Sequence, residues 1–368
     1  MTTLGNMRSH WRFVKAKPSV LPRIANGLFR SIILRQRRLR TVDWAVTYHC
    51  NAKCVMCSAR KLYDPNREEL TLDQREDVWK QALKLGAIHT QFTGGEPLTK
   101  GIDWVCDAIK RLTPEKTLIS MSSNTSLLTK ESIKRMHNAG LDILQLSLDS
   151  MIPETHNRLR GLTDNFEHII KMSRYARDIG MNVNIGCVIA KNNLDEIYKL
   201  VEFTKDEGFG LSACKISNPE NWETDDYVSW STEDYNLYKA VMDIPHVRTD
   251  TFFNFRGSSG CPASGERIEI TAYGDVLSCP QVQISFGNVL EEPLKDIWKR
   301  VWQSPLFHNH CAECRWAWDK KFYDIYLKPY ENEPKPIPYQ RILDDLKSNG
   351  VEPYSPNFKN IKELAKNE

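Results

Sequence analysis

The sequence has no uninterrupted run of about 18 apolar residues, the length that a membrane-spanning helix needs. No secretion signal is expected either, because Arg23, Arg30 and Arg35 interrupt the apolar residues near the N-terminus and no small-residue cleavage site follows. We find no internal repeat and no low-complexity tract. A cytoplasmic, reducing location is therefore expected. The ten cysteines are then expected to be metal ligands, reactive thiols or core residues before they are disulfides.

Acidic residues are missing from the first 40 positions, which contain ten Lys and Arg residues. The rest of the chain has 40 of the 50 basic residues and all 47 acidic ones, so the basic character belongs to an N-terminal arm, 1–40. Apolar residues recur there at three- and four-residue spacing, which predicts a basic amphipathic helix within 19–40. They are Leu21, Ile24, Ala25, Leu28, Phe29, Ile32 and Ile33. The helix can pack on the protein body or lie peripherally on an anionic membrane. No nucleic acid is expected, because basic charge alone is weak evidence for it.

Short β-type runs alternate with helical patterns over 41–217. Strands are predicted near 42–49, 88–93, 117–124, 142–149, 181–189 and 211–216. This repetition predicts an α/β fold with a parallel sheet, and six units predict a partial (β/α)6 barrel rather than the eightfold one. Helix signals include the capping pattern Thr71-x-x-Gln74 and a helix end at Gly140.

The remaining segments differ in composition. We expect a linker or helix over 218–249 and a small metal-stapled domain over 250–318, where short strands, tight turns and four cysteines occur. The proline-rich segment 319–368 is expected to be an extended tail with one short helix near 339–348.

Polar residues alternate with leucines in the fourth predicted strand. Leu144, Leu146 and Leu148 would face the helices, which leaves Gln145, Ser147 and Asp149 inside the barrel. The second strand similarly offers His89, Gln91 and Thr93. Polar residues in a barrel lumen are typical of a ligand site, although they can also be hydrogen bonds internal to the barrel.

Three cysteines, Cys50, Cys54 and Cys57, lie within eight residues directly after the first predicted strand. Thiolates are soft ligands for iron–sulfur clusters, and three of them leave one iron of a [4Fe-4S] cube open to a substrate or cofactor. Zinc is the alternative, with the adjacent His49 as a fourth ligand.

This C-x3-C-x2-C spacing after a first strand resembles that of the radical S-adenosylmethionine (radical SAM) superfamily. Met56 stands where relatives usually have an aromatic residue. The resemblance implies that S-adenosylmethionine chelates the open iron through its amino and carboxylate groups. Its reductive cleavage would give a 5′-deoxyadenosyl radical that abstracts hydrogen from a substrate.

Further matches to the family follow later strands. Gly94, Gly95, Glu96 and Pro97 are similar to the family's glycine-rich motif, in which backbone and acid receive the methionine ammonium group. The resemblance also implies cofactor contacts for residues after the third and fourth strands, where Ser122-Ser123-Asn124 stands in place of the family's usual Thr-Asn-Gly. They are Ser122, Asn124, Ser147, Asp149 and Arg160. A hydrogen-bond network in the lumen is the alternative for the last three.

A second group of cysteines comprises Cys261, Cys279, Cys311 and Cys314, with Gly274 between the first two. This pattern is similar to the twitch domain, a short form of the SPASM domain. Four thiolates saturate one auxiliary [4Fe-4S] cluster, whereas the full SPASM pattern has seven cysteines for two clusters. Structural zinc bound by the same four thiolates is the alternative, and His308 or His310 can replace a thiol in either case.

Two of the other three cysteines, Cys106 and Cys187, are expected in the core. Cys214 lies on the sixth strand, and the sequence leaves undecided whether it faces the lumen. By analogy with radical epimerases, a lumen-facing Cys214 is a candidate hydrogen donor, and a packing role is the alternative.

A saturated auxiliary cluster is suited to moving an electron, which favours net oxidation of a substrate radical. The expected partners are a small-molecule, sugar-like or lipid-linked substrate and a flavodoxin- or ferredoxin-type electron donor. A maturase or epimerase of a ribosomally made peptide stays an alternative. The alternative that is not an enzyme is a non-catalytic binding protein whose cysteines hold zinc.

Overall fold

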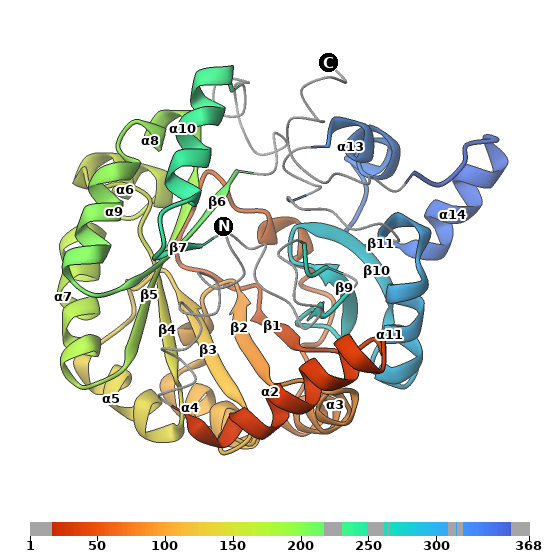
Figure 1. Ribbon diagram of the computed structural model, residues 1–368, viewed down its shortest axis with the longest axis horizontal. Coiled ribbons are helices and arrows are strands. Elements are labelled where there is room, and N and C mark those ends of the chain that lie inside the picture. The colour runs from red at the N-terminus through yellow and green to blue at the C-terminus, as the bar shows by residue number, and fades with distance from the viewer. Residues whose placement is uncertain are drawn as a thin grey trace. The chain divides into compact units, whose positions relative to one another are not determined.

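The computed structural model describes residues 17–216, 230–248, 261–263, 265–307, 314 and 319–354. The chain folds into two compact units, whose helices and strands are drawn in Figure 1. Unit 1 comprises Met1–Leu21, His49–Ser58 and Gln91–Asp250. Unit 2 comprises Pro22–Tyr48, Ala59–Thr90 and Thr251–Glu368. The dividing line therefore differs from the one expected after residue 217, because the first predicted strand belongs to unit 2.

Unit 1 is an α/β unit whose strands follow one another in the order of the sequence. They are β2 (His89–Gly94), β3 (Leu118–Ser123), β4 (Ile143–Ser147), β5 (Asn182–Ile189), β6 (Gly210–Lys215) and β7 (Val247–Arg248). The start of β2, up to Thr90, belongs to unit 2. Every pair from β3 to β7 is parallel. The helices of unit 1 are α4 (Ile102–Arg111), α5 (Lys130–Ala139), α6 (Pro153–Arg160), α7 (Asn165–Asp178), α8 (Lys191–Leu194), α9 (Ile197–Asp206) and α10 (Thr232–Met242).

The alternation predicted for the fourth strand is present in β4. Leu144, Leu146 and Leu148 are fully buried, whereas Gln145 and Ser147 are half-buried on the opposite face. Since α7 packs on β4 and β5, the leucine face is the one that the helices cover. The polar positions consequently line the inner face of the sheet.

Helix ends follow the signals in the sequence. In α3 (Leu72–Leu85) of unit 2, the Thr71 hydroxyl accepts from the Gln74 amide while the Gln74 side chain accepts from the Thr71 amide. In unit 1, α5 ends at Gly140, whose φ of 110° is favourable for glycine alone. Both predicted helix signals are confirmed.

Unit 2 combines parallel and antiparallel pairing. Its strand order is β11 (Ile337–Pro338), β10 (Val282–Asn288), β9 (Asp275–Cys279), β8 (Arg267–Ile270) and β1 (Thr41–Thr47). β8 is antiparallel to β9 and β9 to β10, whereas β1 runs parallel to β8. The other helices of unit 2 are α2 (Leu21–Leu28, which begins in unit 1), α11 (Leu294–Gln303), α13 (Lys320–Tyr326) and α14 (Tyr339–Ser348).

The segment expected as an extended tail is more structured than predicted. Besides α14, which matches the predicted helix, 319–354 contains α13 and β11. Ile337 pairs with Ile284 of β10, and Phe322 and Tyr326 are fully buried. Through these buried aromatic residues, α13 belongs to the core of unit 2. The prolines of the segment favoured the prediction of an extended tail instead.

Among the described residues, no helix is both long and apolar enough to cross a membrane.

Two carboxylates lie side by side in the core of unit 2. Asp43 of β1 is the register partner of Glu269 of β8, and both are at most 2% exposed. The Arg267 guanidinium donates to Asp43. Burial, and then the charge of Asp43, raise the pKa of Glu269 to about 8. Folding therefore favours a protonated Glu269.

We expect Glu269→Gln to flatten the pH dependence of stability. Between its ordinary pKa of 4.5 and about 8, folded Glu269 holds a proton that the unfolded chain releases. The free energy of unfolding should therefore fall as pH rises through this window, by a few kcal/mol at ~1.4 kcal/mol per pKa unit. Urea unfolding across the window measures this slope. Glu291→Gln, at an exposed position, is the matched control. Equal slopes in native protein and Glu269→Gln would contradict the assignment.

Candidate functional site

The segment His49–Ser58, which carries the first three cysteines, belongs to unit 1. Its backbone is attached to the end of α6, because the Lys53 amide donates to the Arg160 carbonyl at 3.2 Å and the Val55 amide to the Leu159 carbonyl at 3.0 Å. Gly161 follows with a φ of 60°, and a Cβ there would lie 2.7 Å from the Lys53 carbonyl oxygen. Glycine at 161 thus allows the cysteine loop to approach the helix.

The three thiols are at least partly accessible, and hydrogen-bond donors lie beside Cys50 and Cys54. Cys50 is exposed, and Cys54 and Cys57 are half-buried. Cys50 Sγ accepts from the Ala52 amide at 3.4 Å and from Asn124 Nδ2 at 3.7 Å. Burial raises the pKa values of Cys50 and Cys54, so these thiols favour the neutral form until a cation or metal stabilises the thiolate.

Arg160 is a cation beside Cys54 that offsets only part of the effect of burial on the pKa of this thiol. Its Nε and Nη2 donate to the two Asp149 oxygens at 2.5 and 2.9 Å, and its Nη1 lies 3.9 Å from Cys54 Sγ. Burial disfavours the guanidinium charge, but Asp149 and Cys54 outweigh it and raise the pKa of Arg160. A planar guanidinium can bond a carboxylate through one edge and still present another N–H, which lysine cannot do.

Asp149 is fixed from several sides. Its side chain accepts from the Val188 amide at 2.9 Å, and its carbonyl accepts from Asn193 Nδ2 at 2.7 Å. Its own amide donates to His156 Nδ1 at 3.3 Å. Burial lowers the pKa of His156 to about 4, so the ring is neutral and can accept this bond. The predicted Asp149 and Arg160 thus form one network with Cys54.

The motif Gly94-Gly95-Glu96-Pro97 forms the turn after β2. Gly94 has a φ of 108°, Gly95 is half-buried and Pro97 is buried at the start of a 3₁₀ turn. The Glu96 amide donates to the His49 carbonyl at 2.9 Å, which connects this turn to the cysteine loop. The motif is therefore in direct contact with the segment that carries the thiols.

The Glu96 carboxylate is 1% exposed and already has protein donors. It accepts from the Asn124 amide at 2.7 Å, from Ser123 Oγ at 3.0 and 3.1 Å and from the Leu98 amide at 3.2 Å. Burial outweighs these bonds and raises the pKa of Glu96 to about 7. Glu96 thus joins the ends of β2 and β3, and its predicted contact with a cofactor ammonium stays a prediction.

A row of amide and hydroxyl side chains crosses the inner face of unit 1. Ser122 accepts from Gln91 at 2.6 Å and from Gln145 at 3.0 Å, while Asn184 donates to Gln145 at 2.8 Å and to Ser212 at 3.0 Å. Gln91 and Gln145 therefore face the lumen as predicted. The structure places Ser122 in this polar row, and its predicted cofactor contact stays untested.

The row also locates Ser147 and Cys214. Ser147 follows Gln145 on the same face of β4, and Cys214 follows Ser212 on the same face of β6, where Val188 is its register partner. Both therefore face the lumen, which answers the question that the sequence left open for Cys214. Cys187 is 2% exposed and Cys106 is 6% exposed, and both are core residues as expected.

The second group of cysteines lies in unit 2, where Cys261, Cys279 and Cys314 are all half-buried. Cys311, His308 and His310 lie outside the described residues. Burial, and then the nearby Cys261 thiol, raise the pKa of Cys279 to about 12, while backbone amides of Val282 and Gln281 donate to its sulfur. Amides directed at a thiolate are typical of iron–sulfur sites, where they tune the potential.

The thiols of Cys50, Cys54 and Cys57 suit the donor chemistry of an iron–sulfur cluster, because thiolates are the ligands that such clusters take. Within the described ranges, no three His, Cys, Asp or Glu side chains converge on a point where one ion could bind. A [4Fe-4S] cube does not require this convergence, because it takes each thiolate at a different iron.

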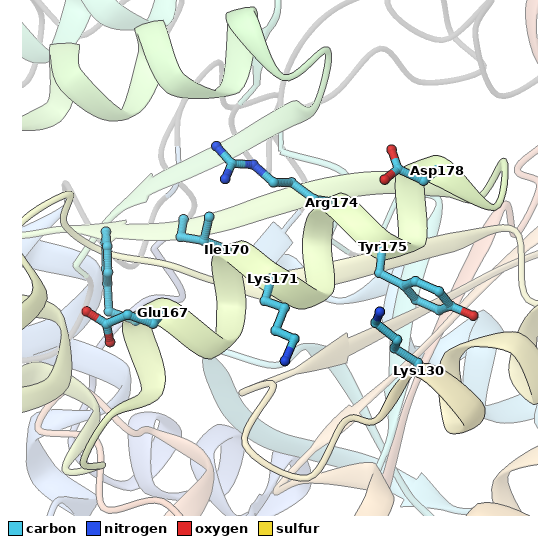
Figure 2. Close-up of a pocket in the computed structure, with 8 residues that line it drawn as sticks. Lys130, Glu167, Ile170, Lys171, Arg174, Tyr175 and Asp178 are labelled. Atoms are coloured by element: carbon cyan, nitrogen blue, oxygen red, sulfur yellow. The ribbon is translucent and has the colours of Figure 1, made fainter.

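A cavity of about 470 Å³ lies elsewhere, on the outer surface of α7. Figure 2 shows that its lining includes Lys130, Ile170, Arg174 and Tyr175. It contains none of the predicted site residues and no cysteine, so it is separate from the candidate site.

The sequence analysis missed residues that support the site. Ser123 donates to Glu96, Asn165 Nδ2 donates to the Asn124 carbonyl at 3.0 Å, and Asn193 holds Asp149. Ser123 could have been found from its neighbours Ser122 and Asn124. Asn165 and Asn193 belong to no motif and carry no sequence signal.

Comparison with known proteins gives two family matches. The radical SAM superfamily model matches residues 44–204, and the SPASM model, an iron-sulfur cluster-binding domain, matches 261–316. The chain is 24% identical over 290 residues to the AdoMet-dependent heme synthase of Methanosarcina barkeri, covering 71% of this chain and 82% of that protein. It is also 24% identical over 291 residues to the PqqA peptide cyclase of Rhizobium meliloti, covering 73% and 75%.

Among solved structures, Streptococcus suis SuiB bound to its precursor peptide SuiA matches with a TM-score of 0.60 and 18% identity. The match covers 79% of this chain and 73% of SuiB. Together with the strands of unit 1 and the SPASM model match over residues 261–316, this likeness in fold confirms the predicted fold class, a partial (β/α) barrel with a C-terminal iron–sulfur domain.

We expect Arg160→Lys to shift the reduction potential of the cluster for which Cys50, Cys54 and Cys57 are the predicted ligands. Lysine keeps the charge but cannot bond Asp149 and approach Cys54 together. Loss of a donor to a cluster sulfur should make the potential more negative by roughly 50 mV, the equivalent of ~1 kcal/mol. Potentiometric titration followed by EPR measures it. Arg158→Lys, at an exposed position of the same helix, is the control. Equal potentials in all three proteins would refute the role of Arg160.

Proposed function

We propose that this chain, which belongs to the radical SAM superfamily and carries a SPASM domain, abstracts hydrogen from a polar substrate and oxidises it by two electrons. A radical SAM domain binds a [4Fe-4S] cluster and S-adenosylmethionine, and a SPASM domain binds auxiliary iron–sulfur clusters. The chemistry supplied when these are bound is one-electron cleavage of S-adenosylmethionine to a 5′-deoxyadenosyl radical. Membership of this family favours iron–sulfur clusters over zinc as the metal sites of the two groups of cysteines.

The proposed ligands of the first cluster are Cys50, Cys54 and Cys57. Three thiolates leave one iron for the amino and carboxylate groups of S-adenosylmethionine. The observation that carries the proposal is the position of Arg160. Its guanidinium bonds to Asp149, and its Nη1 lies 3.9 Å from Cys54 Sγ. It fixes the cysteine loop beside the carboxyl end of β4, the end of parallel strands at which α/β proteins bind ligands.

Cofactor binding is proposed for the turn Gly94–Pro97 and for neighbouring polar groups. Gly94 and Gly95 lack side chains that would hinder a ligand, while Glu96 positions the Asn124 backbone. Ser147 is half-buried on the inner face and can donate a hydrogen bond. These residues would orient the adenosyl carbon toward a substrate C–H bond and exclude water from it.

A two-electron oxidation needs an acceptor for the electron that the substrate radical gives up. We propose that Cys261, Cys279, Cys311 and Cys314 saturate one auxiliary cluster that supplies this acceptor. The amides directed at Cys279 support this assignment, because such donors stabilise a reduced cluster. A flavodoxin- or ferredoxin-type protein is the proposed source of the first electron.

The inner face favours a substrate rich in hydroxyl or amide groups. Gln91, Gln145 and Asn184 present side-chain amides there, and Ser122 and Ser212 present hydroxyls. We therefore propose a small, sugar-like or lipid-linked substrate. A peptide substrate is the second candidate, favoured by the similarity to the PqqA peptide cyclase.

For the peptide candidate, the position of Cys214 adds a specific chemistry. A lumen-facing thiol can return a hydrogen atom to a substrate carbon radical, which would give epimerisation without net oxidation of the substrate. The resulting thiyl radical would then take one electron from a reductant such as the auxiliary cluster and one proton from solvent, which restores the thiol. Solvent deuterium in the product, lost in Cys214→Ala, would favour epimerisation over oxidation.

Anaerobically purified protein should release 5′-deoxyadenosine from S-adenosylmethionine when dithionite is added. Replacing Cys50, Cys54 and Cys57 together with alanine should abolish the release, because no thiolate remains to hold the first cluster. Chromatography of the quenched reaction measures it. Cys106→Ala, which changes a buried cysteine of α4, should keep full activity. Release that persists in the triple variant would refute the site.

Replacing Cys261 and Cys279 with alanine should have the complementary effect. Bound iron should fall from about eight to about four per chain, because only the first cluster remains. Release of 5′-deoxyadenosine without substrate should continue at more than about half the native rate, since unit 1 is unchanged. An unchanged iron content would remove these cysteines from the ligand set.

A further inference from the structure

The helix α2 continues into a wider turn whose apolar side chains face solvent. Phe29–Ile33 is π-helical, with the Leu34 amide bonded to the Phe29 carbonyl. Phe29 is 53% exposed, Ile32 49%, Ile33 64% and Leu34 47%. We call these four residues the α2 face. Four large apolar side chains exposed within six residues form a contiguous patch, which soluble surfaces rarely leave without a function.

The other exposed apolar residues in the part of the chain that the structure describes are scattered. In unit 2, Tyr63, Leu290 and Val351 are exposed singly, at positions far apart in the sequence. Isolated exposed residues of this kind are ordinary on protein surfaces and need no explanation. The concentration of four on one turn sets the α2 face apart.

The opposite side of α2 is anchored by an arginine. Arg23 Nη2 donates to the carbonyls of Leu83 at 3.2 Å and Ala87 at 2.8 Å, at the C-terminal end of α3. That end carries the negative pole of the helix dipole, which favours a cation. The helix thus packs on unit 2 through this side and leaves the α2 face outward.

Positive charge surrounds the α2 face. From Pro22 to Arg38 the sequence contains five arginines and no Asp or Glu. Arg30 bonds to the neutral side chains of Asn26 and Gln36, both at 3.1 Å, and Arg35 is exposed. Arg38 lies over Gly86, and burial together with Arg30 and Arg23 lowers its pKa. Several arginines therefore gather within reach of one another beside an apolar patch.

We propose that the α2 face docks on the surface of an anionic lipid bilayer. Phe29, Ile32 and Ile33 would enter the interface between headgroups and acyl chains, and arginines such as Arg35 would bind lipid phosphates. An apolar patch bordered by basic residues is the arrangement that interfacial helices use, because lipid supplies an apolar layer beneath a negative one. Docking is independent of the proposed chemistry, and it would bring the enzyme to a lipid-linked substrate.

Vesicle flotation of the full-length protein tests this proposal. Phosphatidylcholine vesicles are compared with vesicles that contain about one quarter phosphatidylserine, at low and high salt. Native protein should float with the anionic vesicles and lose this binding in high salt. The variant Phe29→Ser/Ile32→Ser/Ile33→Ser should lose at least about tenfold in partitioning, because the apolar contribution scales with buried area. Arg35→Glu should weaken binding at low salt.

Leu290→Ser is the matched control, because Leu290 is 55% exposed in the same unit but does not belong to the α2 face. It should bind as native protein does. Thermal unfolding, iron content and 5′-deoxyadenosine release should be unchanged in every variant, which separates failure of docking from failure of the enzyme.

Three results would overturn the proposal. They are native protein that fails to float, a triple variant that floats as well as native protein, and binding indifferent to phosphatidylserine. Light scattering tests whether a second copy of this chain covers the α2 face instead. A native dimer that the triple variant converts to a monomer, without vesicle binding by either, would assign the α2 face to contact between two copies.

Discussion

The candidate site depends on one buried ion pair, between Arg160 and Asp149. Taking two charges out of water is costly unless each finds good partners, and here the carboxylate also accepts from the Val188 amide. The same guanidinium reaches Cys54, and the backbone of Arg160 accepts from the cysteine loop. One residue at the end of α6 therefore fixes the loop, orients a thiol and places positive charge beside it.

The inner face of unit 1 has two layers of side chains along its strands, a layer of bonded amides and hydroxyls and a second layer nearer the carboxyl ends of the strands. Amides and hydroxyls bond to one another across β2 to β6 and form a polar floor that needs no ligand for its stability. Ser147 and Cys214 follow toward the carboxyl ends of their strands, nearer to the cysteine loop. A substrate above this floor would meet side chains that are already ordered, which lowers the entropy cost of positioning it.

Much of this arrangement follows from the sequence, because the relevant patterns are local. Leucine alternation located the inner face of β4, and the spacing of Cys50, Cys54 and Cys57 indicated their shared role. Non-local contacts carried no such signal. Nothing in the sequence shows that Glu96 is buried against Ser123, that Asn193 holds Asp149, or that the proline-rich segment adds β11 to β10. The exposure of Phe29 was equally undetermined, since an amphipathic pattern does not say which side meets the protein body.

The central claim is that Cys50, Cys54 and Cys57 hold a cube with one iron open to S-adenosylmethionine. Mössbauer spectroscopy of anaerobic, ⁵⁷Fe-enriched protein tests it most directly. The account predicts about eight irons per chain, all in [4Fe-4S] clusters, of which a single site changes its isomer shift when S-adenosylmethionine is added. Iron that is indifferent to S-adenosylmethionine, or zinc in its place, would contradict it.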